Sequence, residues 1–172
     1  MRLRILLILL ACCFTGTSIA TNGNNTFTLY LVRHAEKQAD GSRDPELTES
    51  GSHRAEQLAI WLQDKNISDI WSSDYKRTRN TAQPLLAELG LELNTYDPRN
   101  QPILVGHLLA RQSTAVIVGH SNTIPKLARL LCECSIADME ESEYDRLIVI
   151  TVDSENVQVK TLRQNHLLQT QN

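Results

Sequence analysis

The chain has 172 residues, of which 22% are charged and 41% are hydrophobic, with 7 glycines and 5 prolines. This composition is typical of a folded domain and excludes disordered, collagen-like and repetitive chains. A chain of this length forms one domain around one core, without room for a second catalytic module. The formal net charge is −3, and no basic run follows the first four positions, so we expect no nucleic-acid partner.

The first twenty residues have the pattern of a secretory signal peptide. Two arginines precede an apolar run from Ile5 to Phe14, and small residues end at Ala20. The apolar run has about half of the ~20 residues that a membrane-spanning helix needs. We therefore predict cleavage after Ala20, export to the periplasm or the medium, and a single domain over residues 21–172. Cleavage removes two basic residues and leaves a net charge of −5.

The four cysteines lie in two pairs. Cys12 ends a stretch that resembles a bacterial lipobox. In that alternative Cys12 is lipidated, and the stretch from Thr15 to Asn25 is a tether. After cleavage at Ala20, only Cys132 and Cys134 remain. In an oxidising compartment these two form a small disulfide, and otherwise they are two free thiols. Both alternatives stay open, and the pair alone offers too few ligands for a metal ion.

The body of the chain alternates predicted strands and helices. Short apolar, β-rich runs predict strands, and apolar residues at helical spacing predict helices. In chain order we expect strands over Phe27–Val32, Asp69–Ser72, Leu91–Tyr96 and Ala115–Val118, helices over Thr48–Lys65, Lys76–Leu89, Pro102–Arg111 and Thr123–Cys132, and a hairpin of Arg146–Val152 with Asn156–Leu162. This order predicts a three-layer α/β domain with a mostly parallel sheet and an antiparallel edge.

Two histidines come directly after predicted strands. His34 follows the first strand through Arg33, and His120 follows the fourth strand through Gly119. Either histidine alone is most simply explained as a structural or exposed residue. Because the carboxyl ends of parallel strands meet at one edge of the sheet, the pair predicts a shared site.

Two arginines are expected at the same edge. Arg33 adjoins His34, and Arg77 lies at the start of the helix that follows the second strand. The planar guanidinium group is suited to holding phosphate oxygens through two hydrogen bonds. A basic residue at a helix N-terminus opposes the helix dipole, and this small cost favours a functional explanation for Arg77.

Four sequence blocks occur in a recognisable order. They are Leu31-Val32-Arg33-His34-Ala35-Glu36, Leu47-Thr48 with Gly51, Ser72 to Arg77 with Thr81-Ala82, and Gly119-His120-Ser121-Asn122. Together they resemble the signature blocks of the histidine phosphatase superfamily, phosphoglycerate-mutase-like branch (branch 1). The resemblance implies that His34 is the nucleophile that becomes a phosphohistidine, that Arg33 and Arg77 clamp the phosphate, and that a protonated His120 completes the pocket.

The resemblance implies hydrolysis of a small phosphorylated substrate in two steps, with no metal and no cofactor. The proton for the leaving oxygen usually comes from a carboxylate beyond the second arginine. Asp97 is the best placed candidate, Glu36 competes with it, and some compact members lack a dedicated acid. Lys37 and Arg43 lie in the loop after the nucleophile, and we expect residues 37–44 and 97–106 to form the outer wall of the pocket.

Three alternatives remain beside an exported phosphatase. A phosphomutase would share the phosphohistidine, but only 42 residues separate Arg77 from His120, which leaves little for a cap over the site. A non-catalytic, phosphate-binding envelope protein could use the same pocket. A serine hydrolase would use Ser121 in a degenerate G-x-S-x-G turn with Asp138 or Asp145 and His166, but it leaves the two arginines unexplained.

Overall fold

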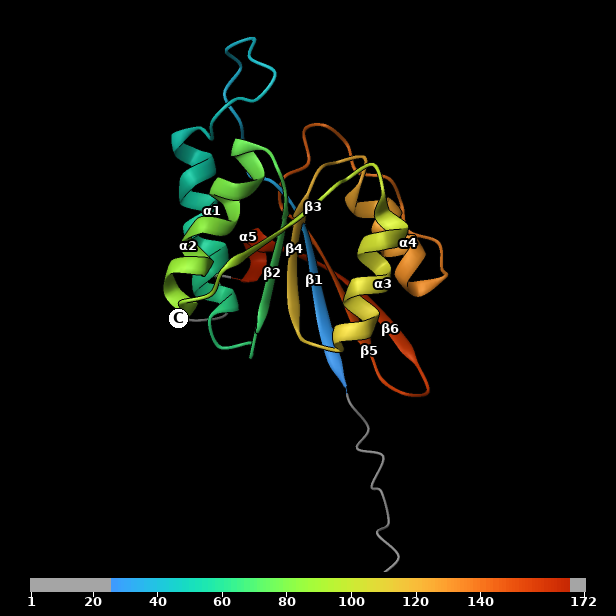
Figure 1. Ribbon diagram of the computed structural model, residues 1–172. Helices are drawn as coiled ribbons and strands as arrows, with labels where there is room; N and C mark the ends of the chain where they lie inside the picture. Colours follow the sequence, from blue (N-terminus) through green and yellow to red (C-terminus); the bar gives the residue numbers. More distant parts are fainter. Residues whose placement is uncertain (1–25, 168–172) are drawn as a thin grey trace, which may run out of the picture.

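The computed structural model describes residues 26–167, which form a six-stranded sheet between two pairs of helices (Figure 1). The strands are β1 (Phe27–Arg33), β2 (Asp69–Ser73), β3 (Leu93–Tyr96), β4 (Ala115–Gly119), β5 (Arg146–Val152) and β6 (Val157–Arg163). The helices are α1 (Glu49–Leu62), α2 (Lys76–Leu89), α3 (Gln101–Arg111), α4 (Ile124–Cys132) and a short α5 (Gln164–Leu167). All the predicted elements are present, and only α5 was not expected. The predicted signal peptide and Cys12 lie outside the described residues.

The sheet is parallel on one side and antiparallel on the other. The strand order is β3-β2-β4-β1-β5-β6. The first four strands of this order are parallel to their neighbours, whereas β5 and β6 form an antiparallel hairpin against β1. This confirms the predicted α/β class, with an antiparallel edge of two strands. The register of β1 with β4 pairs Arg33 with Gly119, so the residues that follow them, His34 and His120, start from adjacent strand ends.

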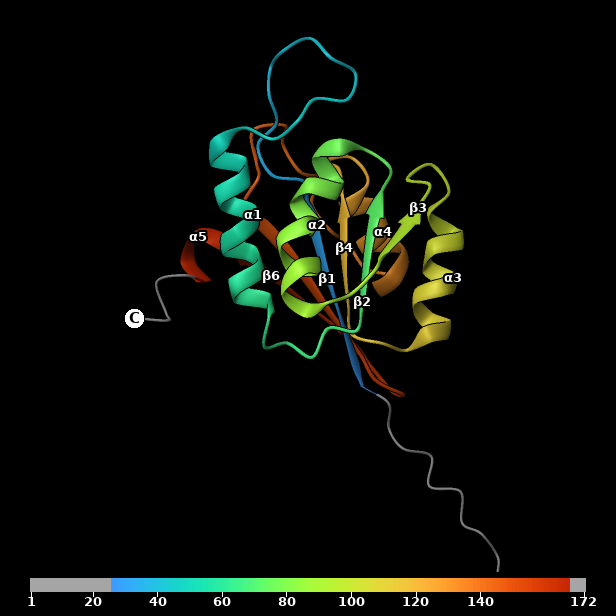
Figure 2. The same cartoon turned by 60° about the vertical axis from the view of Figure 1, so that its left-hand side comes forward.

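The strands between the two helical layers bury both of their faces. In β1, Leu29 and Leu31 belong to the core cluster under α3 and α4, whereas Tyr30 and Val32 belong to the cluster under α1 and α2 (Figure 2). Successive side chains of a strand point to opposite faces. A strand covered on both sides therefore reads as a continuous apolar run, and this explains why β1 and β4 were recognisable in the sequence.

Glycine allows α1 to lie against the chain that follows β1. Thr48 caps α1 by accepting a hydrogen bond from the Gly51 amide at 3.0 Å, and its own amide donates to the Glu36 carbonyl at 2.9 Å. A Cβ atom at Gly51 would lie 2.2 Å from that carbonyl oxygen. The Leu47-Thr48 block with Gly51 therefore fixes the segment that carries the nucleophile candidate.

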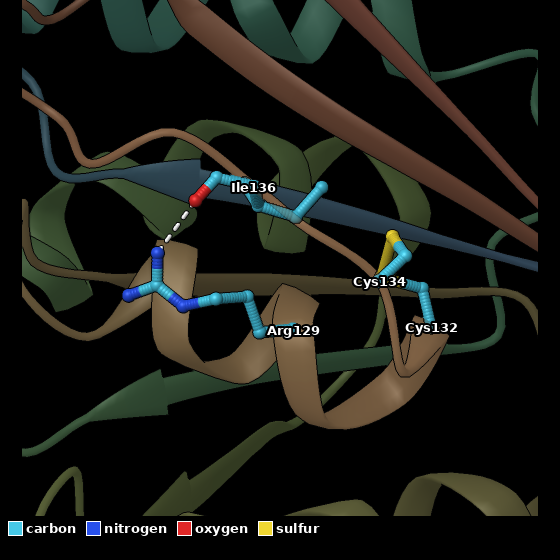
Figure 3. Close-up of a disulfide and its surroundings, with 4 residues drawn as sticks. All are labelled: Arg129, Cys132, Cys134 and Ile136. Carbon is cyan, nitrogen blue, oxygen red and sulfur yellow. Dashed lines mark hydrogen bonds between the residues drawn. A yellow bond between two sulfur atoms is a disulfide. The ribbon is translucent and has the colours of Figure 1, made fainter.

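The end of α4 is closed by a disulfide. Cys132 and Cys134 are bonded with their Cα atoms 5.1 Å apart, inside the usual range, which decides between the two alternatives left by the sequence (Figure 3). Arg129 of the same helix donates to the Ile136 carbonyl at 2.6 Å and so holds the chain that follows. Within residues 26–167, no helix is both long enough and apolar enough to cross a membrane.

Candidate active site

A cavity of about 640 Å³ opens at the carboxyl edge of the parallel strands. Three of the four predicted site residues, His34, Arg77 and His120, line it, together with residues of the 97–106 and 121–130 regions. The full lining comprises His34, Lys37, Tyr75, Arg77, Pro98, Arg99, Gln101, Pro102, His120, Ser121, Asn122, Thr123, Lys126, Leu130 and Glu141. The expected outer wall is present only in part. Lys37 lines the cavity from the first segment, and Pro98, Arg99, Gln101 and Pro102 line it from the second, whereas Arg43 is exposed and does not.

His34 is held as a neutral imidazole with one free ring nitrogen. Its side chain is buried, and Nδ1 lies 2.8 Å from the Ala35 carbonyl oxygen. Because a carbonyl only accepts, Nδ1 carries the proton, and Nε2 keeps its lone pair. Burial, together with the neighbouring charges of Arg33 and Arg77, lowers the pKa of His34 to about 3. At pH 7 this side chain is therefore in the form that can attack phosphorus.

His120 lies beside His34, with the two ring centroids 5.5 Å apart. Its Nε2 atom is 2.9 Å from Ser73 Oγ. The Ser73 hydroxyl donates to Thr78 Oγ1 at 3.1 Å, and the Thr78 hydroxyl donates to backbone carbonyls. His120 must therefore donate to Ser73 from Nε2.

Protonation of His120 around a bound phosphate, as expected from the sequence, stays a prediction. Burial lowers the pKa of His120 to about 4, and the charges of Arg77 and Arg33 act in the same direction. The imidazole is thus neutral at pH 7. A phosphate dianion beside Arg77 would offset the arginine charges and raise this pKa again, so protonation of His120 depends on what the cavity holds.

Arg77 presents buried donors at the cavity. It lies in the first turn of α2, its guanidinium carbon is 4.5 Å from the centre of the Tyr75 ring, and its Nη1 atom is 3.5 Å from Asp44 Oδ1. Among the described residues, Nε and Nη1 are buried and have no hydrogen-bond partner. Leaving buried donors unpaired is costly, and such donors in a cavity wall are suited to an anion.

Arg33 is placed differently from the expected phosphate clamp. It is 1% exposed and does not line the cavity. Its Nη1 atom donates to the carbonyl oxygens of Glu140, Glu141 and Glu143 at 2.8–3.0 Å, and Nη2 donates to the Glu141 carboxylate at 2.9 Å. Nε is buried without a partner in the described part of the chain. In this structure Arg33 holds the segment before β5, and contact with a phosphate stays a prediction.

Neither expected proton donor lies in the cavity. Asp97 is at the surface, where its carboxylate accepts two hydrogen bonds from the Arg99 guanidinium. Glu36 is paired with Arg54 at 2.7 Å and faces a separate hollow of about 250 Å³ between α1 and α5. The carboxylate that does line the cavity is that of Glu141, which no sequence pattern had indicated.

Sequence reasoning missed four residues around the two histidines. Ser73 bonds His120, Tyr75 lies against both Arg77 and His120, and Lys126 and Glu141 line the cavity. Ser73 could have been found, because it ends a buried strand at the same sheet edge. Glu141 could not, because it lies in residues 133–145, which form neither helix nor strand.

The serine-hydrolase arrangement is not assembled among the described side chains. The Ser121 hydroxyl donates to Glu141, whereas Asp138 and Asp145 are paired with Arg129 and Arg163. The side chain of His166 lies outside the described residues. Within the described part of the chain, no group of three or more His, Cys, Asp or Glu side chains is placed to hold a metal ion.

Residues 29–99 match the family model of the histidine phosphatase superfamily, branch 1. This segment of the chain is similar to that superfamily. Probable phosphoglycerate mutases of Photorhabdus laumondii and Escherichia fergusonii are 35% and 36% identical to it over 89 residues, or 48% of this chain. The match spans only 41% of the length of these relatives.

Solved structures of phosphatases share the fold. The protein histidine phosphatase SixA complexed with tungstate has a TM-score of 0.67 at 18% identity, covering 82% of this chain and 99% of its own. A mycobacterial glucosyl-3-phosphoglycerate phosphatase has a TM-score of 0.65 at 18% identity, covering 80% and 98%. These matches cover about four fifths of this chain, more than the segment matched by the family model.

Proposed function

We propose that this chain is an exported phosphatase that hydrolyses phosphomonoesters through a phosphohistidine on His34. The observation that carries the proposal is the pairing of a neutral, buried nucleophile with unpaired arginine donors. His34 Nε2 has its lone pair available, and two buried nitrogens of Arg77 have no hydrogen-bond partner in the described residues, although Nη1 is 3.5 Å from Asp44 Oδ1. Both side chains line the same cavity.

The proposed reaction has two steps. In the first, Nε2 of His34 attacks phosphorus, the bond to the leaving oxygen breaks, and the alcohol departs. In the second, water attacks the phosphohistidine, the N–P bond breaks, and inorganic phosphate leaves. Arg77 would stabilise the charge on the phosphoryl oxygens throughout, and His120 would become a second cationic donor when the dianion raises its pKa.

Export is supported by two independent features. The first twenty residues have the order of a signal peptide, and the Cys132–Cys134 disulfide is of a kind that persists mainly in oxidising compartments. Expression of the full chain with its native N-terminus tests this part. We expect the periplasm or medium to contain a protein that starts at Thr21. A chain that stays in the cytoplasm, or one lipidated at Cys12, contradicts soluble export.

Release of phosphate from para-nitrophenyl phosphate in the presence of a chelator tests the reaction. Residues 21–172 are compared with the His34→Ala variant. We expect activity that survives chelation and is lost in the variant, together with an acid-labile phosphoryl group on the wild type. A wild type that binds inorganic phosphate but never turns over would instead favour the non-catalytic phosphate-binding alternative.

A mutase remains the second candidate, because the relatives at 35–36% identity carry that name. Between Arg77 and His120, this chain has only α2, β3, α3 and β4 with their connections, and no inserted segment covers the cavity. Retaining and re-delivering the phosphoryl group requires exclusion of water. We therefore expect phosphoglycerates to yield inorganic phosphate rather than an isomer, and isomer formation without phosphate release would favour the mutase.

A further inference from the structure

Glu141 is the one carboxylate among the residues that line the cavity of His34 and His120. It lies in the irregular chain between α4 and β5. We propose that Glu141 is the base that takes the proton from the attacking water when the phosphohistidine is hydrolysed. This inference rests on the proposed function, because it assigns a role in the second step of that reaction.

The carboxylate is fixed from both sides although its side chain is 79% exposed. Oε1 accepts a hydrogen bond from the Ser121 hydroxyl, and Oε2 accepts one from Arg33 Nη2 at 2.9 Å. The backbone around it is held as well, because Arg33 Nη1 donates to the carbonyls of residues 140, 141 and 143. Arg33 and Ser121 come from the segments that carry His34 and His120. The base is thereby tied to the same strand ends as the nucleophile.

The charge state of Glu141 favours a base over an acid. The hydrogen bond from Ser121 lowers the pKa of this carboxyl, and the nearby charges of Arg33 and Lys37 act in the same direction. At neutral pH the group is therefore a carboxylate, which can accept a proton but has none to give. Each carboxylate oxygen has acceptor capacity beyond the one hydrogen bond that it makes.

The proposed step balances as follows. The oxygen of water attacks phosphorus, the N–P bond breaks, and its electron pair returns to Nε2 of His34. One proton of the water moves to the Glu141 carboxylate. Because the side chain is mostly exposed, that proton then passes to solvent, and the next cycle starts with the carboxylate restored.

A base without a matching acid also restricts the substrates. In the first step, the leaving oxygen departs from the same side of the phosphorus that the water later approaches. A deprotonated Glu141 gives that oxygen no proton, so the first step is fast only for leaving groups that are stable as anions. We therefore expect aryl and enol phosphates to be better substrates than simple alkyl phosphates.

The Glu141→Gln variant tests the inference with para-nitrophenyl phosphate in a rapid-mixing experiment. The amide keeps the size of the side chain and can still bond Ser121 and Arg33. Nitrophenolate leaves without a proton. We therefore expect an initial burst in which the variant releases one equivalent of nitrophenolate per active site at the wild-type rate. Turnover should then be slower by about 10²-fold, the lower end of the usual effect of a lost general base. Phosphohistidine should accumulate in the variant.

The matched control is Glu140→Gln. Glu140 is the preceding residue, its side chain is exposed, and it does not line the cavity. This control should keep both phases at the wild-type rate. The same experiment on His34→Ala separates the two proposals, because residual activity there contradicts the phosphohistidine mechanism itself.

Two results for Glu141→Gln overturn the inference while wild-type activity still depends on His34. If the variant loses both the burst of nitrophenolate and steady-state turnover, Glu141 serves phosphate binding or the first step. Turnover at the wild-type rate without accumulation of phosphohistidine would mean that the second step does not use this carboxylate.

Discussion

The strand ends and the segment of residues 133–145 hold their polar groups in different ways. His34 and His120 are placed by the backbone register of β1 and β4, in which Arg33 pairs with Gly119. Residues 133–145 form no helix or strand, and arginine side chains hold them, including Arg33 from β1 and Arg146 from β5. The nucleophile thus depends on sheet pairing, whereas Glu141 depends on side-chain hydrogen bonds. Substitutions in the two regions should therefore have different consequences.

The largest effect is expected at the strand-end region, for Arg77→Met. The variant removes the two buried donors, Nε and Nη1, and keeps an unbranched apolar side chain in place of the arginine stem. We expect kcat/KM to fall by about 10³-fold, the upper end of the loss of an oxyanion donor. The control is Arg79→Met in the same helix, since Arg79 pairs with Asp74 at the surface; its kcat/KM should change less than about twofold. Equal effects of the two variants would contradict a phosphate site at Arg77.

For the segment of residues 133–145, the test is Arg33→Met in β1, which should lower the stability of the fold. The variant removes the hydrogen bonds that the buried guanidinium group donates to three carbonyl groups and one carboxylate. At about 1 kcal/mol for each hydrogen bond, the free energy of unfolding should fall by about 3 kcal/mol. Urea denaturation measures this change, with Glu141→Gln as the control that removes only the exposed charge and should cost less than about 1 kcal/mol. A similar small loss in both variants would show that Arg33 does not hold the segment.

The pH dependence of stability tests the strand-end region, because it depends on the two buried histidines there. The pKa values of His34 and His120 are lowered from 6.5 to about 3 and about 4. Below pH 6.5 the unfolded chain therefore binds protons that the folded chain does not, and stability falls as pH falls. Between pH 7 and 5.5, where carboxylates stay ionised, His34 alone should lower the free energy of unfolding by about 1 kcal/mol. Urea denaturation of His34→Gln should show a decline that is smaller by this amount, and an identical decline would contradict the neutral His34.

The smallest effect is expected at the rim of the cavity, for Lys126→Met. Lys126 is exposed, and its charge lies in the wall that an anionic substrate passes. We expect kcat/KM for para-nitrophenyl phosphate to fall roughly threefold at low salt and the difference to shrink as salt screens the charge. Lys160→Met on β6 is the control, because Lys160 is exposed and does not line the cavity. A decrease that does not respond to salt would point to a packing effect.

The sequence was informative wherever function coincides with regular structure. Continuous apolar runs marked β1 and β4, so the residues at their ends, His34 and His120, were identified correctly as neighbours. Arg77 was found because it follows another strand at the same edge. The family model over residues 29–99 matches the part of the chain that holds three of the four blocks, whereas the block at Gly119–Asn122 lies beyond it.

Two carboxylates considered as proton donors are paired with arginines outside the cavity. Asp97 follows a strand as predicted, but its carboxylate bonds Arg99 at the surface. Glu36 is next to the nucleophile block, yet Arg54 of α1 holds it away from the cavity. Their positions in the sequence predicted where their backbones lie. Their arginine partners determine where the carboxylates lie.

The sequence by itself therefore determined the α/β class, the order of the elements and the strand ends at which the histidines lie. The hydrophobic pattern carries this information, because burial on both sheet faces requires apolar residues at every position of a central strand. Only the tertiary structure decided that His120 is neutral, that Arg33 holds residues 140–143 and that Glu141 is the carboxylate of the cavity. These properties come from burial and from contacts between segments up to about a hundred residues apart, which no local pattern encodes.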